Sequence, residues 1–167
     1  GLFLSPLDKM TEIISQIGKD DNAVYLHLKG SNEIKKLSDE FNLMTSRLEE
    51  YHRSSLGQVI KDYHVLKKAF DVFHDPVLLL NSKSDIIFMN QSALTLFEIM
   101  GDIKKINPFL PMEEGIKEAL LKTAHKIHMT KTDYIPEKVE EALPFFKDGK
   151  KLFFLPWGYP IKRLSPN

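Results

Sequence analysis

The feature that most constrains the fold is a run of apolar residues, three and four apart, within "GSNEIKKLSDEFNLMTSRLEEY" at residues 30–51. The charged residues of this stretch lie elsewhere on the helical wheel, so the spacing predicts an amphipathic helix with a narrow apolar seam. One helix cannot bury such a seam alone, and a partner helix is therefore expected. The seam consists of Ile34, Leu37, Phe41, Met44, Leu48 and Tyr51.

A shorter helix is predicted before this one. Pro6 suits a first helical turn, and Gly18 suits the end of a helix. The apolar residues between them, again three and four apart, are Leu7, Met10, Ile14 and Ile17. Between the two predicted helices, an extended connector is expected because Val24, Leu26 and Leu28 alternate with Tyr25 and His27. An extended connector would let the two helices run parallel.

In these features, residues 5–52 resemble the HAMP linker domain of bacterial membrane receptors and sensor kinases. The resemblance depends on Pro6, Gly18, Val24, Leu26, Glu33, Ile34, Phe41, Asn42 and Met44. It implies a parallel homodimeric four-helix bundle over residues 1–52, which passes conformational signals from a membrane helix to a downstream module. The alternative is an ordinary helical hairpin that packs on the rest of the chain.

A second apolar series predicts that the helix continues as a coiled-coil signalling helix over residues 53–68. Its members are Leu56, Val59, Tyr63, Leu66, Phe70 and Phe73. One extra residue between the two series rotates the seam by roughly 100°. Gly57 weakens the helix there by about 1 kcal/mol relative to alanine. The joint is either a rotation switch between two bundles or a tolerated local unwinding.

After residue 68 the pattern changes to short strands. Two apolar runs, Val77 to Leu80 and Ile86 to Met89, predict a hairpin that leads into a helix from Gln91, with Asn90 as its cap. "GIKEALLKTAHKIHM" predicts a longer helix, and "PEKVEEAL" predicts a shorter one. Asp148-Gly149 predicts a second hairpin. Its last strand contains Pro156 and Pro160, which favour an edge or a bulge.

This second region resembles a PAS domain, a sensory α+β fold, over about residues 65–165. The matching residues are Phe73, Asp75, Pro76, Val77, Leu79, Asn90, Ala93 and Phe97. The resemblance implies an antiparallel sheet within residues 69–167 and a ligand pocket. The pocket would be lined by Leu79, Ile87, Asn90, Phe97 and Phe154. In that family a further strand follows the second hairpin and lies in the middle of the sheet. We therefore expect either a truncated domain with an unpaired edge or a different strand register.

Composition excludes several functions. The 23 basic residues balance the 23 acidic residues, so nucleic acid is not an expected partner. The absence of cysteine excludes a disulfide framework and thiolate chemistry. His125 and His128 share a helix face, but no third ligand accompanies them, and neither a metal nor a cofactor is predicted. No phosphoacceptor histidine and no glycine-rich nucleotide loop is seen, so no catalytic residue is predicted.

These expectations combine into a signal-transmission and sensory fragment of a membrane receptor, most simply a two-component sensor histidine kinase. The fragment would lie on the cytoplasmic side of the bacterial inner membrane, as a parallel homodimer between a transmembrane helix and a kinase or other output domain. One alternative is a PAS-type dimer that binds an unknown small ligand. The other is a coiled-coil scaffold that carries an α+β interaction domain.

Overall fold

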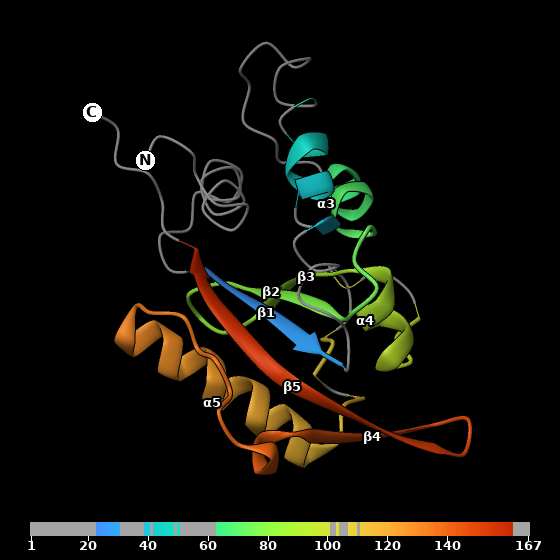
Figure 1. The fold of residues 1–167 in the computed structure, drawn as a ribbon, viewed down its shortest axis with the longest axis vertical. Helices are drawn as coiled ribbons and strands as arrows, with labels where there is room; N and C mark the ends of the chain where they lie inside the picture. The colour runs from blue at the N-terminus through green and yellow to red at the C-terminus, as the bar shows by residue number, and fades with distance from the viewer. Residues whose placement is uncertain are drawn as a thin grey trace.

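The computed structural model describes residues 23–30, 39, 40, 42–48, 50, 63–100, 103, 107–109 and 111–161. Its centre is an antiparallel sheet of five strands, with helices on both faces (Figure 1). The strands are β1 (Ala23–Lys29), β2 (Val77–Leu80), β3 (Ile86–Met89), β4 (Leu143–Lys147) and β5 (Lys150–Ile161). They lie side by side in the order β3-β2-β1-β5-β4.

Strand β1 occupies the middle of the sheet. It pairs antiparallel with β2 on one side and with β5 on the other, so that Tyr25 lies between Leu79 and Tyr159. Residues 23–28 are buried, and a strand that is covered on both faces is typically apolar at nearly every position. The central place, which the PAS resemblance left without a strand, is therefore filled from the N-terminal side of the chain.

One face of the sheet is covered by α5 (Glu114–Thr130) and α4 (Gln91–Leu96) (Figure 1). Val24, Leu26 and Leu28 point to this face because side chains alternate along a strand. Residues from α5 complete the core on this side. They are Ile116, Leu120, Ala124 and Ile127.

The opposite face is covered by α3 (Tyr63–Phe70) and by the helical residues 42–48. Met44 and Leu48 are fully buried, in one cluster with Tyr25, Leu79 and Phe88 of the sheet. The expected four-helix bundle is therefore wrong for the part of the chain that the structure describes. The two seam residues that the structure describes, Met44 and Leu48, pack against a sheet face instead of against other helices.

The expected connector between two parallel helices is also wrong, as Val24 and Leu26 show. Both are fully buried in β1, whereas the HAMP resemblance placed them between two parallel helices. The alternation that suggested a connector is the alternation of a strand whose two faces meet two hydrophobic clusters.

Four other sequence predictions are confirmed, and a fifth is not. The hairpin Val77–Leu80 and Ile86–Met89 forms, a helix begins at Gln91, and α5 covers the predicted long helix. Asp148 and Gly149 make the predicted two-residue turn with positive φ values of 52° and 75°, as a type I′ turn requires. The shorter predicted helix is only the 3-10 turn η1 (Val139–Glu141).

Strand β5 lies inside the sheet and still accommodates two prolines, for a local reason. Gly158 exchanges both backbone hydrogen bonds with Tyr134 on the side of β5 away from β1. Pro156 and Pro160 lie two residues on either side of Gly158, so their backbone nitrogens face that same outer side. The pairing with β4 ends at Phe154, and the prolines therefore remove no donor from a ladder. The expected edge exists, but only along this part of β5.

Several predicted residues lie outside the described part of the chain. They are Pro6, Leu7, Met10, Ile14, Ile17, Glu33, Ile34, Leu37, Phe41, Leu56 and Val59. Tyr63 and Leu66 belong to α3, and Phe70 at its end is fully buried. None of the helices in the described ranges is both long and apolar enough to cross a bilayer.

Candidate functional site

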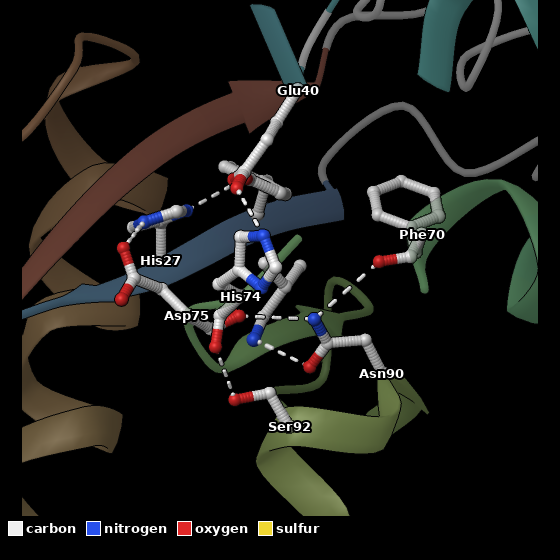
Figure 2. Close-up of polar contacts among 9 residues, drawn as sticks. His27, Glu40, Phe70, His74, Asp75, Asn90 and Ser92 are labelled. Carbon is white, nitrogen blue, oxygen red and sulfur yellow. Dashed lines mark hydrogen bonds and ion pairs between the residues drawn. The ribbon is translucent and has the colours of Figure 1, made fainter. Parts of the chain in front are cut away.

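A group of polar side chains lies near the start of β2, on the face of the sheet that α3 and the helical residues 42–48 cover (Figure 2). We call this group the polar network. Its members are Tyr25, His27, Glu40, His74, Asp75, Asn90 and Ser92. They come from β1, from the helical residues near 40, from the segment between α3 and β2, and from the start of α4. The network therefore joins four separate stretches of the chain.

The centre of the polar network is a chain of three side chains. The Tyr25 hydroxyl lies 3.1 Å from His27 Nδ1, and His27 Nε2 lies 3.1 Å from Asp75 Oδ2. A carboxylate can only accept, so Nε2 carries the proton that it donates to Asp75. With the proton on Nε2, the Nδ1 atom accepts a hydrogen bond from the Tyr25 hydroxyl. All three residues are buried, with His27 only 2% exposed.

The local sequence explains this geometry. Tyr25 and His27 are two residues apart in β1, so both point to the same face of the sheet. His27 is directly opposite Val77 in β2, and the Leu28 amide donates to the Pro76 carbonyl. Asp75 therefore lies two residues before β2 begins, next to His27 of β1.

Burial raises the pKa of the Tyr25 hydroxyl well above its ordinary value of 10.0. The negative charges of Asp75 and Glu40 raise this pKa further. Since the phenolate form is strongly disfavoured, Tyr25 stays a proton donor throughout the neutral range.

Glu40 connects the helical side of the network to the segment before β2. Its carboxylate Oε1 lies 3.6 Å from His74 Nε2. The Glu40 side chain is 11% exposed, whereas the His74 side chain is 66% exposed. His74 is thus the more exposed partner of this ion pair, and Figure 2 shows its ring between Glu40 and the segment that carries Asp75.

Asn90 holds the ends of three elements together. Its Oδ1 accepts from the Val77 amide at 2.9 Å and from the Ala93 amide at 3.0 Å. Its Nδ2 donates to the Asp75 carbonyl at 3.0 Å and, at 3.5 Å, to the Phe70 carbonyl. The predicted helix-capping role is thus confirmed, and it is combined with the fixing of α3 and β2. Ser92 adds a bond from its hydroxyl to the His74 carbonyl at 2.7 Å.

His27 and Asp75 are oriented as a general base and its partner would be, and both side chains are buried. Among the described residues, no three His, Cys, Asp or Glu side chains gather as a metal site would require. A shift of the helix that carries Glu40 would move a charge next to a buried proton chain, where electrostatic effects are strong.

The structure separates most of the residues that sequence reasoning assigned to a ligand pocket. Leu79 belongs to the cluster on the α3 side, whereas Phe97 belongs to the cluster on the α5 side. Ile87 is 41% exposed. Phe97 and Phe154 do come together, because both rings contact Phe145, with centroids 5.4 Å and 5.5 Å apart.

A surface cleft of about 350 Å³ lies between α5, η1 and β5. Its charged and polar lining includes Lys122, Lys126, Tyr134 and Glu140, with Pro156 as part of the apolar wall. Glu141, at the same site, accepts from the Tyr134 hydroxyl and from the Glu137 and Lys138 amides. The cleft is within the size range of small-molecule sites.

Sequence reasoning did not identify Tyr25, His27 and Glu40 as functional residues. The available signal was the order "VYLHL", in which a tyrosine and a histidine share one face of a strand that is otherwise apolar. Polar groups at such positions must find partners. Their partner Asp75 is 48 residues away from His27, so it could not be paired without the fold.

The comparisons with known proteins give one distant relative. The chain is 23% identical over 124 residues to the alginate biosynthesis sensor protein KinB of Pseudomonas aeruginosa. The match covers 71% of the chain and 21% of KinB, so the chain spans about a fifth of the length of this relative. No family model matches the chain, and no solved structure matches it.

Proposed function

We propose that this chain is a sensory signalling module of a larger receptor of the sensor histidine kinase class. The likeness to a sensor protein over most of the chain supports this role. An antiparallel sheet with a hairpin that leads through Asn90 into a helix supports a PAS-like character for residues 63–161. In this proposal β1 completes the sheet of the PAS-like unit.

The observation that carries the proposal is the position of the polar network. It joins the helical segment of Glu40 to the central strand at His27 and to the start of β2 at Asp75. A module that receives a displacement needs contacts that can adopt more than one arrangement. Buried polar contacts meet this requirement because each arrangement has its own hydrogen bonds.

The proposed mechanism begins with a movement of the helical residues 42–48. Met44 and Leu48 are buried against the sheet, so the helix moves as a packed unit and Glu40 moves with it. The position of the Glu40 carboxylate then alters the field at Tyr25 and the contact with His74. Asp75 and Asn90 extend this change to β2 and α4.

The context proposed for the module is the one expected from sequence. The receptor would be a parallel homodimer, with a transmembrane helix before the module and a kinase or other output domain after it. The module would lie on the cytoplasmic side of the bacterial inner membrane. Light scattering across a concentration series measures the homodimer directly, and a monomer at every concentration would contradict it.

The experiment that tests the signalling role uses the receptor that carries this chain, in membranes. The variants Glu40→Gln and Asp75→Asn keep the side-chain shape but remove one charge each. We expect several-fold changes in basal autophosphorylation. The matched control is Glu118→Gln, an exposed carboxylate on α5 outside the network. Unchanged basal and stimulated output in both network variants, with normal protein levels, would contradict the proposal.

A second candidate function, small-ligand binding, is favoured by the cleft beside Tyr134. A ligand there would be expected to carry an anionic group for Lys122 and Lys126 and an apolar part for Pro156. Native mass spectrometry of the purified chain tests this function. A bound molecule that is lost in Lys126→Ala supports it, and a ligand-free chain in both proteins contradicts it.

A further inference from the structure

The tip of the β4–β5 hairpin exposes large apolar side chains to solvent. Phe146 is 73% exposed, Phe153 is 56% exposed and Leu152 is 37% exposed. Phe153 is directly opposite Pro144, so the two share a face of the hairpin. Phe146 is two residues after Pro144 in β4, and it therefore lies on that same face. Leu152 points to the other face. Both faces of the tip are therefore partly apolar, which is unusual for a hairpin surrounded only by water.

The hairpin is a fixed projection of the molecule. Figure 1 shows its turn extending beyond α4 and α5. The Asp148-Gly149 turn matches the twist of the strands. Directly before the turn, Lys147 Nζ donates to the Thr95 carbonyl near the end of α4, 3.3 Å away. The exposed side chains therefore stand on a well-defined element.

Positive charge accompanies these apolar side chains. Residues 143–161 contain the three lysines Lys147, Lys150 and Lys151 but only one acid, Asp148, although the whole chain is neutral. Lys151 Nζ lies 5.5 Å from the ring centroid of Phe146 and 5.3 Å from that of Phe153. The charge is thus held directly over the two exposed rings.

We propose that the tip of the β4–β5 hairpin binds the surface of an anionic phospholipid bilayer. Phenylalanine and leucine side chains would enter the boundary between headgroups and acyl chains. Lys150 and Lys151 would contact the anionic headgroups. A bilayer fits better than a folded partner because the feature is a convex projection with apolar side chains on both faces. A protein partner would cover one face or fill a groove.

The test uses the full 167-residue chain and sedimentation with vesicles of equal parts phosphatidylcholine and phosphatidylglycerol. We expect binding to these vesicles, much weaker binding to phosphatidylcholine alone, and loss of binding at high salt. Phe153→Ser is expected to weaken binding roughly tenfold.

Two further variants make the test specific. Lys150→Gln with Lys151→Gln should weaken binding to the anionic vesicles without altering any buried residue. The matched control is Val139→Ser, which removes an apolar side chain that is 84% exposed in η1, and it should bind as the wild type does. Circular dichroism checks that each variant is folded, and the lysine variant remains informative if Phe153→Ser is not.

Three outcomes would overturn the proposal. The first is no binding to either type of vesicle. The second is binding that the hairpin variants leave unchanged. The third is a dimer in light scattering that Phe153→Ser dissociates while no vesicle binding is found, because that result assigns the hairpin to a second copy of the chain. Membrane binding by the hairpin is independent of the signalling role, because it requires neither the polar network nor an output domain.

Discussion

Tyr25 shows how a single residue of β1 combines packing with electrostatics. It is buried at the centre of the sheet, its hydroxyl bonds to His27, and its pKa is raised by burial first and by Asp75 and Glu40 next. The unfolded chain has an ordinary tyrosine pKa near 10.0. Stabilisation by the protonated form is therefore fully present below pH 10 and decreases as the pH rises above it.

The raised pKa of Tyr25 predicts how the stability of the chain depends on pH. Above the unfolded-state pKa, unfolding releases the Tyr25 proton, so the free energy of unfolding should fall by up to about 1.4 kcal/mol per pH unit from this residue. Tyr25→Phe should reduce the slope by this amount, although it also leaves His27 Nδ1 without the hydroxyl. Urea denaturation between pH 9 and pH 11 measures both slopes. Equal slopes would show that Tyr25 ionises as easily in the folded chain as in the unfolded chain.

Asn90 supports a second prediction at this scale. Asn90→Ala removes the acceptor for the Val77 and Ala93 amides and both donors of the side chain. Because Asn90 is fully buried, water cannot replace these bonds easily, and we expect a loss of at least about 2 kcal/mol of unfolding free energy. Gln91→Ala, one residue later and exposed, is the matched control. A loss in Asn90→Ala no larger than in the control would contradict the assigned role.

At the scale of elements, the packing of α5 on the sheet depends on Gly158 in β5. A Cβ atom built at Gly158 would lie 2.0 Å from Ile127 Cδ1 and 3.1 Å from Leu26 Cδ2. Gly158 also exchanges two backbone bonds with Tyr134. The absence of a side chain at this one position thus allows α5, β1 and the Tyr134 segment to approach together.

Gly158→Ala should therefore destabilise the chain by about 1–3 kcal/mol. Combining it with Ile127→Ala should cost less than the sum of the two single changes, because the smaller side chain makes room for the methyl group. Thermal unfolding of the four proteins measures the coupling. Gly115→Ala in α5 is the control, since nothing lies within 4 Å of its Cβ position, and it should stabilise by roughly 0.5 kcal/mol. Strict additivity would argue against the contact between Gly158 and Ile127.

The elements also show what the sequence allowed us to predict. The first hairpin, the helix after Asn90, α5 and the Asp148-Gly149 turn all have local signals, and the structure contains each of them. The surface against which Met44 and Leu48 pack could not be predicted from such local signals. An apolar helix face fits a sheet as well as another helix, and periodicity does not distinguish the two.

At the scale of the whole molecule, β1 makes one sheet from two hairpins. It is the strand that joins β2 and β3 on one side to β5 and β4 on the other, and it contributes to the cores on both faces. The same strand carries His27 into the polar network. Its pairing with β5 joins residues more than a hundred positions apart, such as Val24 and Pro160, so no local pattern could reveal it. The network was not foreseen for the same reason.

The central claim is that residues 23–29 form the middle strand of this sheet, and amide hydrogen exchange resolved by NMR tests it most directly. If the claim is correct, the amides of residues 24–28 exchange as slowly as those of β5 that pair with them. Their protection should exceed roughly a thousandfold, because they open only with the whole fold. Exchange of these amides within seconds, while those of β5 stay protected, would contradict the claim and would make this stretch an exposed connector.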